Sequence, residues 1–282
     1  MITLDGKALA AKIKSELAEK VKDLPRKPGL AVILVGDDPA SRTYVNGKRR
    51  DCEECGFLSE EYALPATTTQ AELLELIAKL NKREEVDGIL VQLPLPAGLD
   101  AIALLDAIVP DKDVDCFHPV NVGKLYTGQK GGFVPCTPGG VMALLHEYHI
   151  DPAGKTCVVL GRSNIVGKPM AALLLAENGT VTVCHSKTPN LAEVCQRADI
   201  LVAAVGKVGL VTGDMVKDGA VVIDVAMNRD SEGKLCGDVD VDSVAPKASY
   251  LTPVPGGVGP MTRAILMENT YRSALRHLGL EH

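Results

Sequence analysis

Short apolar runs alternate with segments of helical periodicity along this chain, and this alternation limits the possible folds more than any other feature. The runs are continuous, as in strands buried on both faces, and do not alternate apolar with polar residues. In the first half, the pattern predicts strands at 30–36, 57–63 and 88–92 and helices at 9–24, 41–55 and 70–81. Such alternation is typical of a layered α/β domain with a parallel-rich sheet.

A second alternating series begins with the apolar run at 156–161. A helix at 169–177 follows it, and further strands are predicted at 181–184, 200–205 and 221–225. This order is that of a dinucleotide-type half-fold. Between the two series, segment 110–138 is rich in Asp, Gly and Pro, which break regular structure. We interpret it as the crossing between domains.

We therefore expect an α/β fold of two domains, which the length of 282 residues allows. The first domain comprises 1–118 together with 261–282, because an amphipathic helix at 261–278 can return to it. The second domain comprises 135–256, and 119–134 joins the two. The last three residues, Leu280 to His282, resemble the stub of an expression tag.

Composition excludes several classes of protein. With a net charge of −6 the chain has no excess of basic residues to bind a phosphate backbone, and with only 3% aromatic residues it has few side chains on which bases can stack. Composition therefore argues against nucleic acid as a partner. Eight cysteines without a secretory leader predict reduced thiols and a cytoplasmic protein. Cys52 and Cys55 have the spacing of a redox or metal pair, but without a second pair at zinc spacing we favour coincidence. No apolar stretch is long enough to span a membrane.

A glycine-containing loop, Gly161–Pro169, follows the first strand of the second series and opens a helix. In such loops, backbone N–H groups and the positive end of the helix can bind phosphate. The loop lacks the GxGxxG pattern, however, so a purely structural turn is the alternative interpretation. An NAD enzyme normally places an acid at the end of the next strand, where this chain has His185–Thr188. Arg162 and Ser186 suit a 2′-phosphate, so the sequence favours NADP over NAD, with a solvated loop as the alternative.

Three polar features of the first half are candidates for chemistry. Tyr44 and Lys48 share one face of a predicted helix, where the ring can shield the amine and make it a base, or where both simply face solvent. Gln92 ends an apolar strand just before two prolines, which suits either a ligand site or a solvated sheet edge. Asp115 lies in the polar turn 111–115, which also suits plain surface.

Seven motifs, in the same order and over almost the whole chain, resemble the bifunctional methylenetetrahydrofolate dehydrogenase/methenyltetrahydrofolate cyclohydrolase family. They are VGDDPASRTYVNGK, VQLPLP, PDKDVD, PCTPGG, GRSNIVGKP, CHSKT and TPVPGGVGPMT. The resemblance implies a catalytic domain completed by the C-terminal helix, an NADP-binding Rossmann-type domain, a folate cleft and a homodimer. It implies NADP-dependent oxidation of methylenetetrahydrofolate, then hydrolysis of the methenyl product to formyltetrahydrofolate, in the one-carbon metabolism that supplies purine and amino-acid biosynthesis.

The resemblance also implies roles for individual residues. Lys48 becomes the catalytic amine, Tyr44 the ring beside the folate, Gln92 the hydrogen-bond partner of the lysine and Asp115 the anchor of the pterin. A second set is implied to bind the cofactor: Gly161, Arg162, Ser163, Ser186 and Met227. A third set is implied to border the folate: Pro255, Gly256, Gly257 and Val258. No metal site is implied.

The chain departs from the usual family pattern at two places. Cys116 stands where glycine is common after the aspartate, and its side chain is expected to displace Asp115 or narrow the folate pocket. Ala226 and Met227 stand where glycine and isoleucine are common. We expect altered kinetics and retained function.

Two other functions compete with this interpretation. One is a two-domain NADP dehydrogenase that acts on a small acid without hydrolysis and gives Gln92 no role. The other is a catalytically silent dinucleotide-binding protein. The joint presence of Tyr44, Lys48, Gln92 and Asp115 argues against both.

Overall fold

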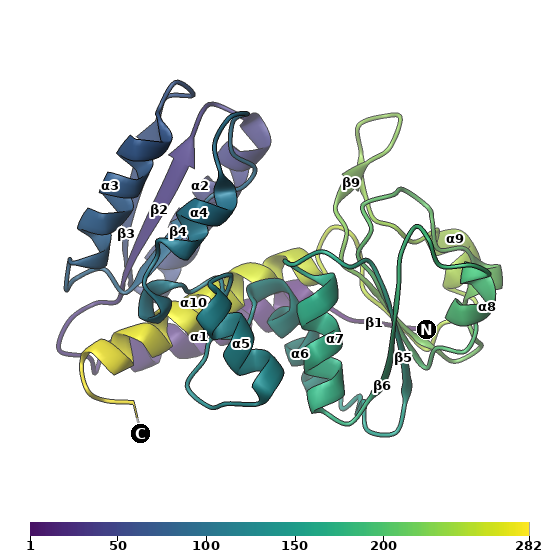
Figure 1. The fold of residues 1–282 in the computed structure, drawn as a ribbon. Coiled ribbons are helices and arrows are strands. Elements are labelled where there is room, and N and C mark those ends of the chain that lie inside the picture. Colours follow the sequence, from purple (N-terminus) through teal and green to yellow (C-terminus); the bar gives the residue numbers. More distant parts are fainter. Residues whose placement is uncertain (282) are drawn as a thin grey trace. The chain divides into compact units, whose positions relative to one another are not determined.

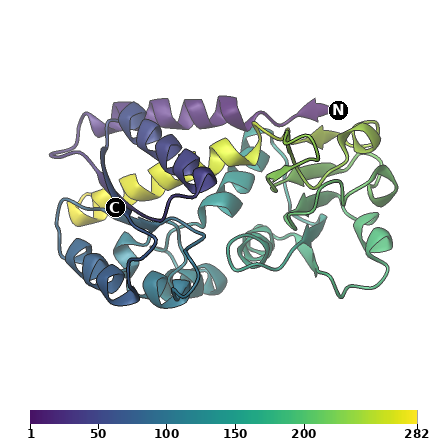
Figure 2. The ribbon, with the colours of Figure 1, turned by 90° about the horizontal axis from the view of Figure 1, so that it is seen from above.

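The computed structural model describes residues 1–281, which form two compact units (Figure 1). We call Met1–Ala10 with Pro135–Thr262 the large-sheet unit. We call Ala11–Val134 with the chain from Arg263 onward the small-sheet unit. Two helices, α1 (Gly6–Val21) and α10 (Val258–His277), contribute residues to both units, and Figure 2 shows each as a continuous helix.

A parallel sheet with the strand order β3-β2-β4 forms the centre of the small-sheet unit. The strands are β2 (Gly29–Val35), β3 (Leu58–Leu64) and β4 (Gly88–Val91). The helices are α2 (Pro39–Cys55), α3 (Gln70–Asn81), α4 (Ala101–Asp106) and α5 (Pro119–Thr127), with a 3-10 turn η1 at Pro110–Lys112. Every residue of the central strand β2 is buried, and its odd-numbered side chains share a core with Leu73, Ile77 and Leu80 of α3 and Leu104 of α4.

The large-sheet unit contains a second parallel sheet, with the order β1-β11-β8-β7-β5-β6. Its strands are β1 (Ile2–Thr3), β5 (Thr156–Leu160), β6 (Thr180–Cys184), β7 (Ile200–Ala203), β8 (Val221–Asp224) and β11 (Tyr250–Leu251). Its other elements are α6 (Cys136–Glu147), α7 (Gly167–Ala176), α8 (Leu191–Cys195), α9 (Val241–Val244), the 3-10 turn η2 (Gly213–Met215) and the antiparallel pair β9 (Asn228–Arg229) and β10 (Leu235–Cys236). Figure 1 shows α6 and α7 on one side of the sheet and α8 and α9 on the other.

The predicted α/β architecture is confirmed, including the return of the C-terminal helix to the small-sheet unit. The domain boundaries differ from those expected. Met1–Ala10 belongs to the large-sheet unit, because β1 pairs with β11. The expected crossing segment 119–134 belongs to the small-sheet unit and contains α5. His282, part of the expected tag stub, lies outside the described residues, whereas Glu281 accepts a hydrogen bond from Arg276 Nη2 at 3.1 Å.

Across residues 1–281, no helix has both the length and the apolarity that a membrane crossing requires.

A buried carboxylate, Asp87, ties the C-terminal helix to the small sheet. Its oxygens accept hydrogen bonds from Arg26 Nη1 at 2.6 Å and Nη2 at 2.7 Å, from Gly29 N at 2.9 Å and from His277 Nδ1 at 2.8 Å. Ser273 Oγ on the same helix donates to the backbone carbonyl of Asp87 at 2.7 Å. Burial alone raises the pKa of this carboxyl, but the donors outweigh burial and hold it below its ordinary value of 3.8.

We expect Asp87→Ala to lower the free energy of unfolding by about 3–5 kcal/mol near neutral pH, because the change leaves the Arg26 guanidinium without its carboxylate partner. The folded-state pKa of Asp87 is depressed, so its stabilisation is complete above the unfolded-state value and is lost as the pH falls below about 4. Urea unfolding at about pH 7 and about pH 3.5 measures the difference.

Asp23→Ala is the matched control, because Asp23 is an exposed acid of the same unit. It is expected to change stability by less than about 0.5 kcal/mol. The assigned role is contradicted if Asp87→Ala loses no more free energy of unfolding than the control does. It is also contradicted if that loss is larger at about pH 3.5 than at about pH 7.

Candidate functional site

Helix α2 carries Tyr44 and Lys48, and local interactions define both of its ends. Asp38 caps the start by accepting the Ser41 N–H at 2.7 Å, and Pro39 occupies the first turn, where a missing N–H does no harm. Gly56 ends the helix in the left-handed conformation, with φ of 75°. Tyr44 and Lys48 therefore lie one turn apart on one helix face, as predicted.

Lys48 and Gln92 are brought together, although 44 residues separate them in sequence. Lys48 Nζ donates to Gln92 Oε1 at 2.9 Å. Gln92 follows the last residue of β4 and continues its ladder by donating its backbone N–H to Ile33 O at 2.9 Å. Its Nε2 donates to Leu93 O at 2.6 Å, which orients the amide with its oxygen toward the lysine. The geometry contains the hydrogen bond that the family resemblance implies.

Ser41, which was not predicted as a site residue, lies on the same face of α2 as Tyr44 and Lys48. Its side chain is buried, and its hydroxyl has no hydrogen-bond partner among the described residues. Tyr44, by contrast, is 41% exposed. The spacing of positions 41, 44 and 48 was the available signal, since residues three and four apart share a helix face.

The turn that carries Asp115 is held by a different acid, Asp113. The Asp113 carboxylate accepts the N–H groups of Phe117 at 3.0 Å and His118 at 2.9 Å, and Asn121 Nδ2 at 2.8 Å. Burial raises the pKa of Asp113 to about 6. Asp115 takes no part in these hydrogen bonds and is only half-buried.

Cys116 has the left-handed backbone conformation that glycine adopts most easily, with φ of 62°. Its side chain is 1% exposed, and Sγ donates to Phe133 O at 3.1 Å. Asn269 Nδ2 on α10 links the two segments that contain Cys116 and Phe133, because it donates to Val114 O and Val134 O, both at 2.8 Å. The thiol is therefore directed into the interior, against Phe133.

We expect Cys116→Gly to be more stable than Cys116→Ala by about 1 kcal/mol. Both variants lose the thiol contact, but alanine keeps the strained left-handed backbone and glycine does not. Urea unfolding of the two variants side by side measures the difference. If the two variants are equally stable, or if the alanine variant is the more stable one, the backbone at position 116 is not strained.

The predicted cofactor residues lie at the carboxyl ends of neighbouring strands of the large sheet. Gly161 follows β5 with φ of 117°, and a Cβ there would lie 2.3 Å from Ala204 O. A Cβ at Gly167, the first residue of α7, would lie 2.2 Å from Gly161 O. Ser163 Oγ accepts the Val166 N–H at 3.1 Å at the start of that helix. Both glycines are thus required by close backbone approach.

Arg162 and Ser186 are both exposed at this edge of the large sheet. They follow β5 and β6, whose last residues, Leu160 and Cys184, are paired in register. The turn after β6 is fixed by His185, whose backbone N–H donates to Thr188 Oγ1 at 2.9 Å. The basic and hydroxyl groups that were predicted to receive a phosphate therefore lie on adjacent strand ends.

Met227 and the loop 252–257 form another part of the large-sheet unit. Met227 is 42% exposed, and a Cβ added at Gly259 would lie 3.2 Å from its Cε, so it packs over the start of α10. Gly256 has φ of 112°, and its carbonyl accepts the Lys7 N–H at 2.9 Å. Gly257 N donates to Pro253 O at 2.8 Å. These bonds shape the loop that contains Pro255 and leads to Val258.

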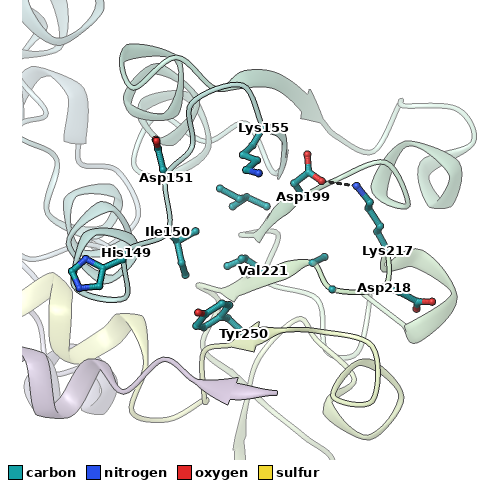
Figure 3. Close-up of a pocket in the computed structure, with 12 residues that line it drawn as sticks. His149, Ile150, Asp151, Lys155, Asp199, Lys217, Asp218, Val221 and Tyr250 are labelled. Atoms are coloured by element: carbon teal, nitrogen blue, oxygen red, sulfur yellow. Dashed lines mark hydrogen bonds and ion pairs between the residues drawn. The ribbon is translucent and has the colours of Figure 1, made fainter.

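A cavity of about 460 Å³ lies at the other edge of the large sheet, near the amino ends of β5, β7 and β8 (Figure 3). Its walls include Ile150, Tyr250 and an ion pair in which Lys217 Nζ lies 2.5 Å from Asp199 Oδ1. That pair lowers the pKa of Asp199. None of the predicted site residues lines this cavity. Ligand sites in open parallel sheets form at the carboxyl ends of strands.

All eight cysteines within residues 1–281 are free thiols, and seven are buried. Burial raises the pKa of both Cys52 and Cys55 to about 12. Neither therefore forms a thiolate near neutral pH, and both pack as core residues of α2.

Two family models match the chain. The catalytic domain of tetrahydrofolate dehydrogenase/cyclohydrolase matches residues 4–115, and the NAD(P)-binding domain matches residues 135–278. A curated relative, the bifunctional protein FolD of Acetivibrio thermocellus, is 62% identical over 274 residues, which is 96% of each chain.

Solved structures agree with these matches. The bifunctional enzyme FolD of Campylobacter jejuni has a TM-score of 0.96 at 54% identity and covers 98% of this chain and 99% of its own. The methylenetetrahydrofolate dehydrogenase-cyclohydrolase of Trypanosoma brucei, solved with NADP and an inhibitor, has a TM-score of 0.94 at 43% identity and covers 99% and 98%. The chain therefore belongs to the tetrahydrofolate dehydrogenase/cyclohydrolase family.

Proposed function

We propose that Lys48, Gln92, Tyr44 and Asp115 serve the two reactions of this bifunctional enzyme. The enzyme oxidises methylenetetrahydrofolate with NADP and hydrolyses the methenyl product to formyltetrahydrofolate, in one-carbon metabolism. The observation that carries the catalytic assignment is the 2.9 Å hydrogen bond from Lys48 Nζ to Gln92 Oε1. It places the amine beside an oriented amide at the carboxyl end of a parallel strand, where ligands bind in such sheets.

The large-sheet unit fits NADP. The turn from Gly161 to Gly167 has no room for side chains at either glycine, so backbone can approach a phosphate closely. Arg162, Ser163 and Ser186 are exposed hydrogen-bonding groups at the same edge, and Met227 is an exposed apolar one. We assign Arg162 and Ser186 to the 2′-phosphate. When bound, NADP supplies the hydride acceptor of the oxidation.

Lys48 is assigned as the group that moves protons during hydrolysis. Attack of water on the methenyl carbon requires a proton acceptor, and an amine held in place by Gln92 can take that role. Hydride transfer itself has no such requirement. The two activities therefore depend on Lys48 to different degrees.

The remaining residues are assigned to binding of the folate. A carboxylate accepts two N–H bonds at once, which suits Asp115 to the donor-rich edge of the pterin. The exposed ring of Tyr44 is assigned to the folate next to Lys48. The loop residues Pro255, Gly256, Gly257 and Val258 are assigned to the border of the folate site.

We further propose that the enzyme acts as a homodimer in the cytoplasm. The largely buried, free cysteines suit a reducing compartment. Light scattering after gel filtration measures the mass in solution, and a mass of one chain at micromolar concentration excludes the dimer.

The direct test supplies methylenetetrahydrofolate with NADP or with NAD and follows the reduced nucleotide and methenyl hydrolysis separately. Both activities are expected, with NADP preferred. Nucleotide reduction without hydrolysis supports a dehydrogenase of a different kind. The absence of both activities supports a silent nucleotide-binding protein.

We expect Lys48→Met to lower methenyl hydrolysis about a hundredfold or more, since methionine keeps much of the side-chain length but has no amine. Dehydrogenase activity is expected to remain measurable.

Gln92→Ala is expected to lower hydrolysis and to shift its pH profile, because the lysine loses the acceptor that holds it. Hydrolysis and nucleotide reduction, each followed across pH, measure both effects.

Arg50→Met is the matched control, because Arg50 is an exposed cation of the same helix. Its hydrolysis rate is expected to stay within about twofold of wild type. Wild-type hydrolysis in Lys48→Met removes the lysine from the mechanism and returns it to the status of a solvated side chain.

We expect Arg162→Gln to weaken NADP binding by about 1.5 to 3 kcal/mol and to leave NAD binding nearly unchanged, because only NADP carries the 2′-phosphate. Titration calorimetry with each nucleotide measures both affinities. Arg197→Gln, a change of another exposed arginine in the same unit, is the control. Equal losses for NADP and NAD refute the assignment of Arg162.

A further inference from the structure

A fully buried carboxylate, Asp238, organises the loop that leaves strand β7. Its side chain is 0% exposed. Oδ2 accepts the N–H groups of Val205 at 2.6 Å and Gly206 at 3.1 Å, and Oδ1 accepts the Lys207 N–H at 2.6 Å. Three successive backbone donors therefore converge on one carboxylate, which fixes the path of this loop.

The same carboxylate reaches the segment that leaves β8. Asn228 Nδ2 donates to Asp238 Oδ1 at 3.0 Å, and Asn228 directly follows Met227, which is assigned to the cofactor. Strands β7 and β8 are parallel neighbours with Ala203 opposite Asp224, so both segments leave the sheet at one edge. Asp238 joins them there.

Asp238 is itself held by Asp224, the last residue of β8. Asp224 Oδ1 accepts the Asp238 N–H at 3.0 Å, and Oδ2 accepts the Val239 N–H at 2.9 Å. Thr252 Oγ1 in turn accepts the Asp224 N–H at 2.7 Å. A Cβ at Gly237 would lie 1.9 Å from Asp224 Oδ2, so the approach of these segments allows no side chain there. The position of Asp238 is thus set from the sheet.

The loop held by Asp238 borders the proposed cofactor turn. The carbonyl of Ala204, the residue before the loop, is the group that a Cβ at Gly161 would meet at 2.3 Å. The strand order β8-β7-β5-β6 also indicates the direction in which a bound dinucleotide crosses the strand ends. Arg162 and Ser186, assigned to the 2′-phosphate of the adenosine half, follow β5 and β6. A dinucleotide that begins there extends its nicotinamide half across the ends of β7 and β8.

We propose that Asp238 is a positioning residue for the nicotinamide half of NADP, acting through the backbone of Val205, Gly206 and Lys207; this inference rests on the proposed NADP-dependent function. An ionised carboxylate offers only acceptors to these donors. An asparagine in its place turns an NH₂ group toward N–H groups, so the loop loses at least one bond and changes shape. Asp238 touches neither reacting group and acts through the loop alone.

The test compares Asp238→Asn with wild type by calorimetric titration of NADP and of adenosine 2′,5′-bisphosphate, which has the adenosine half alone. NADP is expected to bind about tenfold more weakly or worse, and the bisphosphate within about twofold of wild type. Hydrolysis of supplied methenyltetrahydrofolate without nucleotide is expected to stay within about twofold, whereas kcat/KM for NADP reduction falls. Asp240→Asn is the control, since its carboxylate accepts from Ser243 Oγ and not from the loop.

Equal weakening of NADP and the bisphosphate, or unchanged NADP affinity, overturns the proposal. If Asp238→Asn does not fold, Gly206→Ala carries the same test. Gly206 has φ of 80°, so alanine disturbs the loop and leaves Asp238 intact. The same split between NADP and the bisphosphate is expected, and its absence overturns the proposal. A wild-type protein without either enzymatic activity counts against the proposed function, while the titrations still test the loop.

Discussion

Parallel pairing is the constraint on which the rest of this structure depends. In both main sheets every strand pair is parallel, so the chain returns through a connecting segment and all strands end at one edge of their sheet. Residues far apart in sequence are therefore collected at that edge. Gln92 after β4 is one example in the small sheet, and Gly161, His185 and Ala204 are examples in the large one.

Buried carboxylates supply acceptors for backbone N–H groups at the starts of strands and in the loops that connect them. Asp87, Asp113 and Asp238 each accept several donors, including backbone N–H groups. Burying a charge is unfavourable unless such donors surround it. For Asp113 the burial dominates and raises the pKa to about 6, whereas for Asp87 the donors Arg26, His277 and Gly29 together outweigh the burial and lower the pKa. The acids that shape the loops are thus distinct from Asp115, which is left half-buried.

The sequence predicted those elements whose signal is local. Helix α3 has the bounds expected from periodicity, and the longer strands begin and end within two residues of the predicted positions. Helix α6 was not predicted because Pro138, Gly139 and Gly140 resemble breakers. Gly140 is required by packing, since a Cβ there would lie 2.7 Å from Met261 Cβ. Strand β1 is too short for any pattern and exists through its pairing with β11.

The site was predictable to the extent that its residues follow strands or share a helix face. Nothing local distinguishes Asp113, which is buried, from Asp115, and nothing local links Asp238 to a loop 31–33 residues earlier. Cys116 shows the same limit. A position with φ of 62° favours glycine, and a side chain is accommodated there only if the interior offers it space and a partner. Phe133 O provides that partner, from a segment 17 residues away. Whether a departure from a family's glycine displaces the neighbouring aspartate therefore depends on tertiary contacts that the motif does not contain.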